Sequence, residues 1–254
     1  MRQTLLSINI NKYALVRNSR GHNAPNLFTT IDTCIEAGAK GITVHPRLDQ
    51  RHIRFDDVPQ IAEYLRQHHP QIEYNIECEP DPGLIQKVIA LRPHQCTLVP
   101  VTPGELASDH GWDLPRQHNL IAPVISALKE AKIRVSLFAD CEPQHMRYFS
   151  ESGADRIELY TGPFAWAYGT DKQDYETQRV YDAAQAAHEL GLGVNAGHDL
   201  DRHNLPLLRQ LSCLQEVSIG HAHLCRALEV GTSQSVKELL DALISDDLSL
   251  THHD

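Results

Sequence analysis

Residues 41–54 read Gly41-Ile42-Thr43-Val44-His45-Pro46-Arg47-Leu48-Asp49-Gln50-Arg51-His52-Ile53-Arg54. The run from Gly41 to Val44 is short, apolar and β-branched, which is typical of a strand buried on both faces. It stops at a histidine and a proline, and arginines and a second histidine follow before an amphipathic helix opens near Phe55. A strand, a cationic loop and a helix in this order predict a unit that handles phosphate. The alternative is a solvated charged loop, and only the rest of the chain distinguishes the two.

The boundary that precedes Gly41 recurs along the chain. A short apolar strand follows each of Glu36-Ala37-Gly38-Ala39, Glu151-Ser152-Gly153-Ala154 and Glu189-Leu190-Gly191-Leu192, with Glu130-Ala131-Lys132 as a weaker copy. Glycine caps the end of a helix well, so these stretches are typical of helices that feed parallel strands.

The apolar periodicity predicts eight strands and eight helices in alternation. We expect strands at 5–10, 41–44, 72–76, 96–99, 133–137, 156–160, 193–196 and 217–219. We expect helices at 27–37, 58–69, 83–90, 120–131, 145–151, 175–190, 205–211 and 236–244. Residues 11–22 are a predicted loop with three cations, and 100–115 are either a mobile lid or an ordinary surface loop. About eight β/α units, with no GxGxxG fingerprint, favour a single (β/α)8 TIM barrel over residues 1–254 and disfavour a doubly wound sheet.

Composition excludes several classes of protein. The net charge of −10 over 254 residues argues against a general nucleic-acid binder, because phosphate backbones are bound mainly by excess Lys and Arg. No apolar run approaches the length that spans a bilayer, so we expect a cytoplasmic protein with no signal peptide and no membrane partner. The six cysteines form no CxxC pair, and reduced thiols are therefore expected.

Polar side chains follow the predicted strands. In a parallel barrel all strands end at one face, where active sites are built. The residues that would meet there are Asn9, His45, Glu77, the loop after Val99, His198 and Gly220-His221. One acid and three histidines from four different strands predict a catalytic site, although any one of them alone could be structural.

Two stretches have the same order of strand, glycine, histidine and helix start, namely Asn195-Ala196-Gly197-His198-Asp199 and Ser218-Ile219-Gly220-His221-Ala222. Glycine allows close approach of the backbone, and the loops after the last two strands commonly bind phosphate in barrels. Arg20, Arg47 and His52 form a second predicted cationic cluster. The sequence therefore predicts a ligand set with two phosphate groups.

These residues belong to motifs that resemble the pyridoxine 5'-phosphate synthase family of vitamin B6 biosynthesis. The motifs are Asn9-Ile10-Asn11-Lys12 with Arg17-Asn18-Ser19-Arg20-Gly21, Gly41 to Arg47 with Arg51-His52-Ile53, Asn75-Ile76-Glu77, Leu98-Val99-Pro100, Val194 to His198 and Ile219-Gly220-His221-Ala222. The resemblance covers nearly the whole chain. It implies a (β/α)8 barrel with extra helices, a homo-octamer, and no metal or organic cofactor.

The resemblance also implies the reaction and the roles of residues. The enzyme would condense 3-amino-2-oxopropyl phosphate with 1-deoxy-D-xylulose 5-phosphate to pyridoxine 5'-phosphate, phosphate and water. The general base would be His45, the catalytic glutamate Glu77 and the proton donor His198. The aminoketone phosphate would be bound by Asn9, Arg20, Asp199, Gly220 and His221, and the xylulose phosphate by Asn11, Lys12, Arg47 and His52.

This chain departs from many family members at a few positions. Asn11-Lys12 stands where many carry Asp-His, Asp199 where many carry Gly, and Ala107 where many carry Thr. Ala107 has no hydroxyl, for which adjacent Ser108 could substitute. Asp199 would have to bind phosphate through its backbone N–H, because its carboxylate repels an anion.

Three other functions remain open from the sequence. A metal-dependent barrel hydrolase could use His45, Glu77, His198, His221 and His223 as ligands. An aldolase could form a Schiff base on Lys12. A non-catalytic paralogue could bind phosphorylated metabolites, with Ala107 and Asp199 as signs of lost activity.

Overall fold

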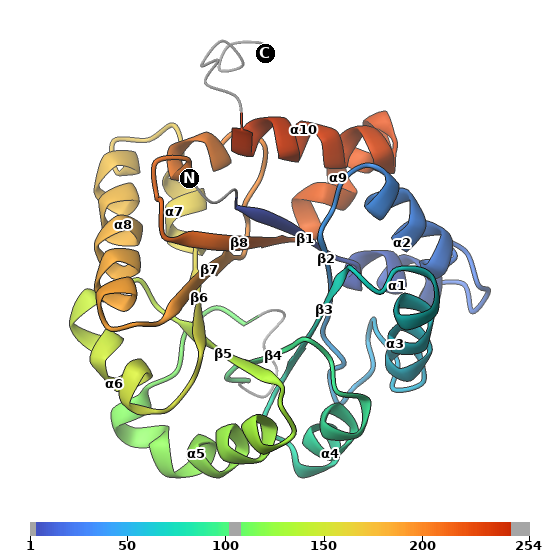
Figure 1. Ribbon diagram of the computed structural model, residues 1–254. Helices are drawn as coiled ribbons and strands as arrows, with labels where there is room; N and C mark the ends of the chain where they lie inside the picture. The colour runs from blue at the N-terminus through green and yellow to red at the C-terminus, as the bar shows by residue number, and fades with distance from the viewer. Residues whose placement is uncertain (1–3, 102–107, 245–254) are drawn as a thin grey trace.

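The computed structural model describes residues 4–101 and 108–244. Its centre is a closed barrel of eight parallel strands in sequential order, with β8 paired to β1 (Figure 1). The strands are β1 (Leu5–Asn9), β2 (Gly41–Val44), β3 (Glu73–Cys78), β4 (Gln95–Leu98), β5 (Arg134–Ala139), β6 (Arg156–Tyr160), β7 (Gly193–Gly197) and β8 (Leu214–Ile219). The predicted (β/α)8 barrel is confirmed.

Helices form a ring outside the strands (Figure 1). They are α1 (Asn11–Asn18), α2 (Leu27–Glu36), α3 (Asp57–His68), α4 (Pro82–Leu91), α5 (Leu114–Glu130), α6 (Met146–Glu151), α7 (Gly162–Ala167), α8 (Gln173–Glu189), α9 (His221–Val230) and α10 (Thr232–Ile244), with 3-10 helices η1 (Pro143–His145) and η2 (Leu205–Leu208). Two helices follow each of β1, β6 and β8, which accounts for the extra helices expected in the barrel.

The structure corrects several predicted elements. Residues 11–18, predicted as loop, form α1, which packs Tyr13 and Ala14 into the hydrophobic core; the Asn9 side chain accepts a hydrogen bond from the Asn11 N–H (3.0 Å) at its start. Helix α5 begins at Leu114, six residues before the prediction, with proline in its first turn. Helix α7 was not predicted, and the helix expected at 205–211 is the short 3-10 helix η2. Residues 102–107, which include Ala107 and part of the predicted lid, lie outside the described residues.

The hydrophobic core lies between the strands and the helices. Successive side chains of a strand point to opposite faces. The even-numbered positions of β2 and β3, such as Ile42, Val44 and Ile76, are fully buried and belong to one apolar cluster with the helices. The odd-numbered positions Thr43 and Asn75 therefore point into the barrel.

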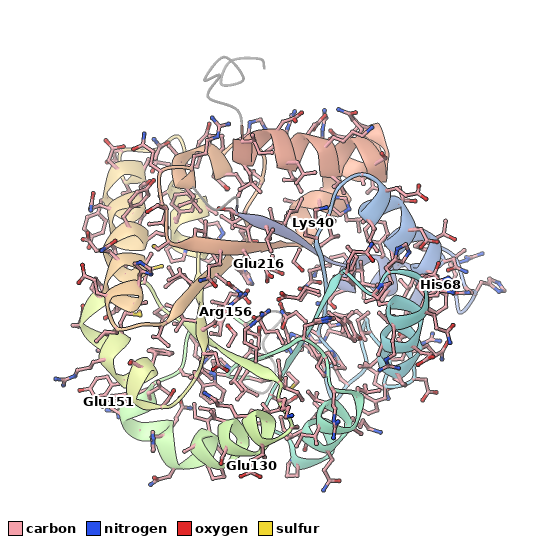
Figure 2. The ribbon with its side chains drawn as sticks, in the orientation of Figure 1. Lys40, His68, Glu130, Glu151, Arg156 and Glu216 are labelled. Carbon is pink, nitrogen blue, oxygen red and sulfur yellow. The ribbon has the colours of Figure 1, made fainter. Side chains whose placement is uncertain are left out.

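The interior of the barrel is polar, which the sequence analysis did not predict. Side chains from seven strands form a hydrogen-bonded belt that consists of Ser7, Thr43, Asn75, Thr97, Gln95, Arg156, Asn195 and Glu216. Arg156 and Glu216 lie within the ring of strands, whereas His68, Glu130 and Glu151 lie on the outer helices (Figure 2). The belt satisfies polar groups that burial would otherwise penalise, and it forms the floor beneath the carboxyl ends of the strands.

None of the helices in the described part of the chain has both the length and the apolar character needed to cross a bilayer.

Candidate active site

A pocket of about 310 Å³ opens at the carboxyl ends of the strands. It is lined by most of the residues that the sequence predicted: Asn9, Asn11, Lys12, His45, Arg47, His52, Glu77, His198, Asp199, Gly220 and His221. Ser108 and Glu158 also line it. The structure thus brings together the predicted acid, the predicted histidines, the two glycine turns, and Arg47 and His52 of the predicted cationic cluster.

Two asparagines connect the first strand to the second at this mouth. The Asn11 side chain accepts a hydrogen bond from the backbone N–H of His45 (2.9 Å), and this fixes the start of the loop after β2. Asn9 directs its amide nitrogen at the two carboxyl oxygens of Glu77, at 3.4 and 3.5 Å. His45 Nδ1 lies 3.5 Å from Glu77 Oε2. A histidine and a carboxyl group therefore meet in one corner of the pocket.

Burial controls the protonation of Glu77. It raises the pKa of this carboxyl to about 7, and the nearby Glu216 adds to that rise, although Arg47 and the Asn9 amide act in the opposite direction. A group with such a pKa holds a proton about half of the time near neutrality, which suits proton transfer. The sequence left open whether burial or the arginines would prevail, and in the structure burial does.

The two histidines of this corner are neutral. Burial lowers the pKa of His45 well below its usual value, and Arg47 and His52 lower it further. Burial, followed by Arg47 and Lys12, lowers the pKa of His52 to about 4. The contact between His45 and Glu77 is therefore no ion pair, and neutral His45 can accept a proton.

Glu158 is a pocket residue that the sequence analysis missed. It lies in β6 between Ile157 and Leu159, and burial, with a contribution from Glu77, raises its pKa well above the usual value. A Cβ at residue 197 would collide with its carboxyl group, so Gly197 makes room for it. The available signal was the alternation of the strand, since a charged residue at its centre must face the interior.

Cationic side chains line the wall that adjoins this corner. Arg47 donates a hydrogen bond to Ser108 Oγ (3.3 Å), which ties the loop after β2 to the segment that follows residue 107. Lys12, in the first turn of α1, and His52 line the pocket beside it. Guanidinium and ammonium groups at the same pocket as helix N-termini suit a phosphate group.

The glycine turns after β7 and β8 differ from each other. A helix starts directly after Gly220, as predicted, and Gly220 packs so closely on Asn9 that a Cβ would lie 3.0 Å from the Asn9 carbonyl oxygen. After Gly197 the prediction of a helix start is wrong. There His198 and Asp199 adopt positive φ angles of 88° and 57°, and the carboxylate of Asp199 accepts a hydrogen bond from Trp166 Nε1 (2.9 Å).

Two residues named in the sequence analysis lie away from the pocket. Arg20 is exposed after the end of α1 and is not among the lining residues. His223, a ligand in the metal-hydrolase hypothesis, is fully buried and bonded through its ring nitrogens to Tyr13 (3.1 Å) and Ser235 (2.9 Å). Within residues 4–101 and 108–244, no three His, Cys, Asp or Glu side chains group closely enough to hold a metal ion.

The sequence matches a known protein family over nearly the whole chain. Residues 6–245 match the profile of the family described as pyridoxal phosphate biosynthesis protein PdxJ. This chain belongs to the PdxJ family. A relative from Albidiferax ferrireducens named pyridoxine 5'-phosphate synthase is 46% identical over 245 residues, with 93% of this chain and 96% of the relative covered. A relative of the same name from Leptospira biflexa is 43% identical over 252 residues, with 94% and 97% covered.

Solved structures similar to this PdxJ-family chain show the fold alone. Tryptophan synthase from M. tuberculosis aligns with a TM-score of 0.65 at 11% identity and covers 96% of this chain and 94% of that chain. A structure described as native KDPGal aligns with a TM-score of 0.60 at 12% identity, with 95% and 97% covered. The barrel is shared across these proteins although their sequences are only 11% and 12% identical to this chain.

Proposed function

We propose that this PdxJ-family protein is a pyridoxine 5'-phosphate synthase, which condenses 3-amino-2-oxopropyl phosphate with 1-deoxy-D-xylulose 5-phosphate to pyridoxine 5'-phosphate, phosphate and water. The observation that carries the proposal is one pocket in which a carboxyl group with a pKa of about 7 lies against a neutral histidine, beside a cationic wall. Curated relatives with this name support it.

The chemistry needs these groups. Closing a pyridine ring from an amine and two carbonyl compounds requires imine formation, enolisation, loss of phosphate and loss of water, and each step moves protons. Glu77 and His45 can take protons from carbon or nitrogen, because one is half-ionised near neutrality and the other is neutral. His198, on the far side of the pocket, would return a proton to the departing oxygen.

The two phosphate groups would occupy different walls. Lys12, Arg47 and His52, with the Asn11 side chain, would hold the xylulose phosphate. Asn9, Gly220 and His221, with the backbone of Asp199, would hold the aminoketone phosphate. We leave Arg20 out of the pocket contacts, because its side chain is exposed elsewhere on the protein.

A two-substrate assay that measures both pyridoxine 5'-phosphate and released phosphate tests the proposal. We expect the two products in equal amounts, with turnover that depends on both substrates. Binding of both substrates without any product would favour the non-catalytic paralogue instead.

Assays in chelator separate the synthase from the metal-dependent hydrolase. The residues proposed here act as acids, bases and phosphate ligands, so we expect full turnover after prolonged chelation and dialysis. Loss of turnover that zinc or manganese restores would contradict the proposed mechanism. We also propose that the protein is a cytoplasmic homo-octamer, which light scattering of the purified protein and cell fractionation would test.

A further inference from the structure

The turn after β7 places His198 in a strained backbone. His198 and Asp199 are consecutive residues with side chains, and both have positive φ angles, 88° and 57°. Residues other than glycine adopt such angles only when the surrounding structure holds them there. Here the Thr161 hydroxyl lies 2.7 Å from the carbonyl oxygens of both Gly197 and His198 and can donate to either.

The strained turn directs the Asp199 side chain toward His198. Asp199 Oδ2 lies 3.3 Å from His198 Nδ1, an ion-pair distance without the alignment of a hydrogen bond. The same oxygen accepts the indole N–H of Trp166 at 2.9 Å. His198 is the largest influence that lowers the pKa of the Asp199 carboxyl, which is therefore ionised at neutral pH. A carboxylate that would repel phosphate is thus occupied by an imidazole and an indole.

Aromatic rings restrict the imidazole from another side. Tyr160, the last residue of β6, lies edge-to-face against His198 with ring centroids 5.1 Å apart. Trp166, on α7, lies edge-on to the same tyrosine at 6.4 Å. The indole of Trp166 is 64% exposed, so its burial contributes little to the core, and its hydrogen bond to Asp199 is its clearest contact.

We propose that Asp199 and Trp166 are positioning residues that orient the imidazole of His198 for proton transfer to substrate. The carboxylate holds the proton on Nδ1, so that Nε2 is the nitrogen that exchanges a proton with the reacting molecule. Trp166 holds the carboxylate in place from the extra helix after β6. This inference rests on the proposed function, since it assigns the orientation of the predicted proton donor.

Strain gives the proposal a signature that a structural role lacks. Glycine adopts a positive φ without strain, so Asp199→Gly should keep or raise the melting temperature. The same variant removes the carboxylate, so its kcat should fall. If Asp199 only stabilised the turn, the melting temperature and kcat of this variant would fall together.

The kinetic test compares four variants of the full-length protein. Asp199→Asn and Asp199→Gly should each lower kcat roughly tenfold or more, with KM for the xylulose phosphate within about twofold of the parent. Trp166→Phe should lower kcat less, because the carboxylate remains. Asp201→Asn is the matched control: Asp201 lies in the same turn, and its Oδ1 accepts the backbone N–H groups of His203 and Asn204, which an asparagine oxygen can also do. We expect parental kcat for this control.

Nitrogen NMR of the histidine side chains tests the pair without any turnover. The signal of His198, assigned by its loss in His198→Gln, should show the proton on Nδ1 in the parent and in Asp201→Asn. In Asp199→Asn and Asp199→Gly it should move toward the tautomer with the proton on Nε2.

The outcomes separate the two proposals. If the parent protein shows no turnover, the synthase function is overturned. The NMR signal of His198 then tests the contact between His198 and Asp199 by itself. Asp199→Asn with parental kcat and an unchanged His198 signal overturns the positioning role. So does an Asp199→Gly variant that loses melting temperature in step with kcat while its His198 signal stays parental.

Discussion

At Glu77, burial and a nearby cation act in opposite directions. The side chain is 13% exposed, faces the polar interior of the barrel, and receives only long contacts from the Asn9 amide. Long hydrogen bonds stabilise the ionised form weakly, so burial prevails and the pKa rises to about 7. A carboxyl group in this state is a better base than an exposed glutamate.

Replacing Glu77 and Arg47 should separate catalysis from binding. Glu77→Gln keeps the size and shape of the side chain but cannot accept a proton, so turnover should fall by roughly two to four orders of magnitude with little change in substrate affinity. Arg47→Ala should mainly weaken binding of the xylulose phosphate, because a charge-assisted contact is lost. Steady-state kinetics and calorimetric titration measure both effects. A Glu77→Gln variant that turns over within a few fold of the parent would show that Glu77 is structural.

The raised pKa of Glu77 predicts opposite effects of pH on activity and on stability. Turnover should rise as pH increases through about 7, since the base must lose its proton. In the unfolded chain the Glu77 carboxyl group titrates near 4.5. The folded protein holds this proton more tightly, so the contribution of Glu77 to the free energy of unfolding is complete below pH 4.5 and is lost as pH rises through 7.

Glu77→Gln should therefore be more stable than the parent at pH 8, by up to roughly 3 kcal/mol, and close to it at pH 4.5. Urea unfolding at the two pH values measures the difference. Glu130→Gln, on the outer helix α5 (Figure 2), is the control and should follow the parent at both. An equal difference at both pH values would mean that ionisation of Glu77 has no part in the effect.

At the scale of elements, the two helices that border the pocket are tied together behind it. Tyr13 follows Lys12 on α1, and His223 follows His221 by two residues on α9. The Tyr13 hydroxyl lies 3.1 Å from His223 Nε2 and 3.0 Å from Thr232 Oγ1, and these two contacts join α1, α9 and α10. Burial lowers the pKa of His223 to about 4, which keeps it neutral.

Tyr13→Phe should weaken this connection. It leaves the buried imidazole without one partner, which costs about 1 to 3 kcal/mol in the free energy of unfolding. Because the helix starts that carry Lys12 and His221 are then less well fixed, we expect KM for both substrates to rise several-fold while kcat changes little. Tyr181→Phe, which removes a hydrogen bond to the Leu207 carbonyl (2.9 Å) on another side of the barrel, should alter stability without altering KM. Equal KM values in the two variants would contradict the expectation.

At the scale of the whole molecule, charged side chains lie inside the barrel. Arg156 lies 3.9 Å from Glu73 and donates hydrogen bonds to Gln95 and Asn195, both at 3.3 Å. Burial and Glu73 raise the pKa of Glu216 well above its usual value, whereas Arg156 opposes that rise. Arg134 also donates a hydrogen bond to the Gln95 side chain (2.9 Å) and pairs with Glu73, so Arg156 acts together with a second arginine among these carboxyl and amide groups.

Arg156→Met should destabilise the protein by about 3 kcal/mol, because it removes a buried cation beside Glu73 and the hydrogen bond that Asn195 Oδ1 accepts. Thermal and urea unfolding measure this change. Lys129→Met is the control: its ion pair with Asp155 (2.9 Å) lies on the surface, where such pairs contribute about 0 to 1 kcal/mol. Comparable losses of unfolding free energy in the two variants would show that Arg156 in the interior belt contributes no more to stability than a surface ion pair.

Much of this protein follows from sequence alone. The strands at 41–44 and 156–160 were predicted with their observed ends, since each is a short run that closely follows a glycine-capped helix end, a signal that lies within a few residues of the strand. The residues at the strand ends could also be predicted to share one pocket, because a parallel barrel leaves no other face for them.

Other features depend on contacts between distant residues, and only the tertiary structure decided them. Whether Glu77 is a base depends on how far Asn9 and Arg47 lie from its carboxyl group, and no local pattern contains that distance. The inward direction of Glu158 depends on space beside Gly197 of the next strand, and the exposed position of Arg20 depends on the length of α1. Short-range preferences determined the elements and the members of the site, whereas protonation and orientation arise from burial, which exists only once the barrel has closed.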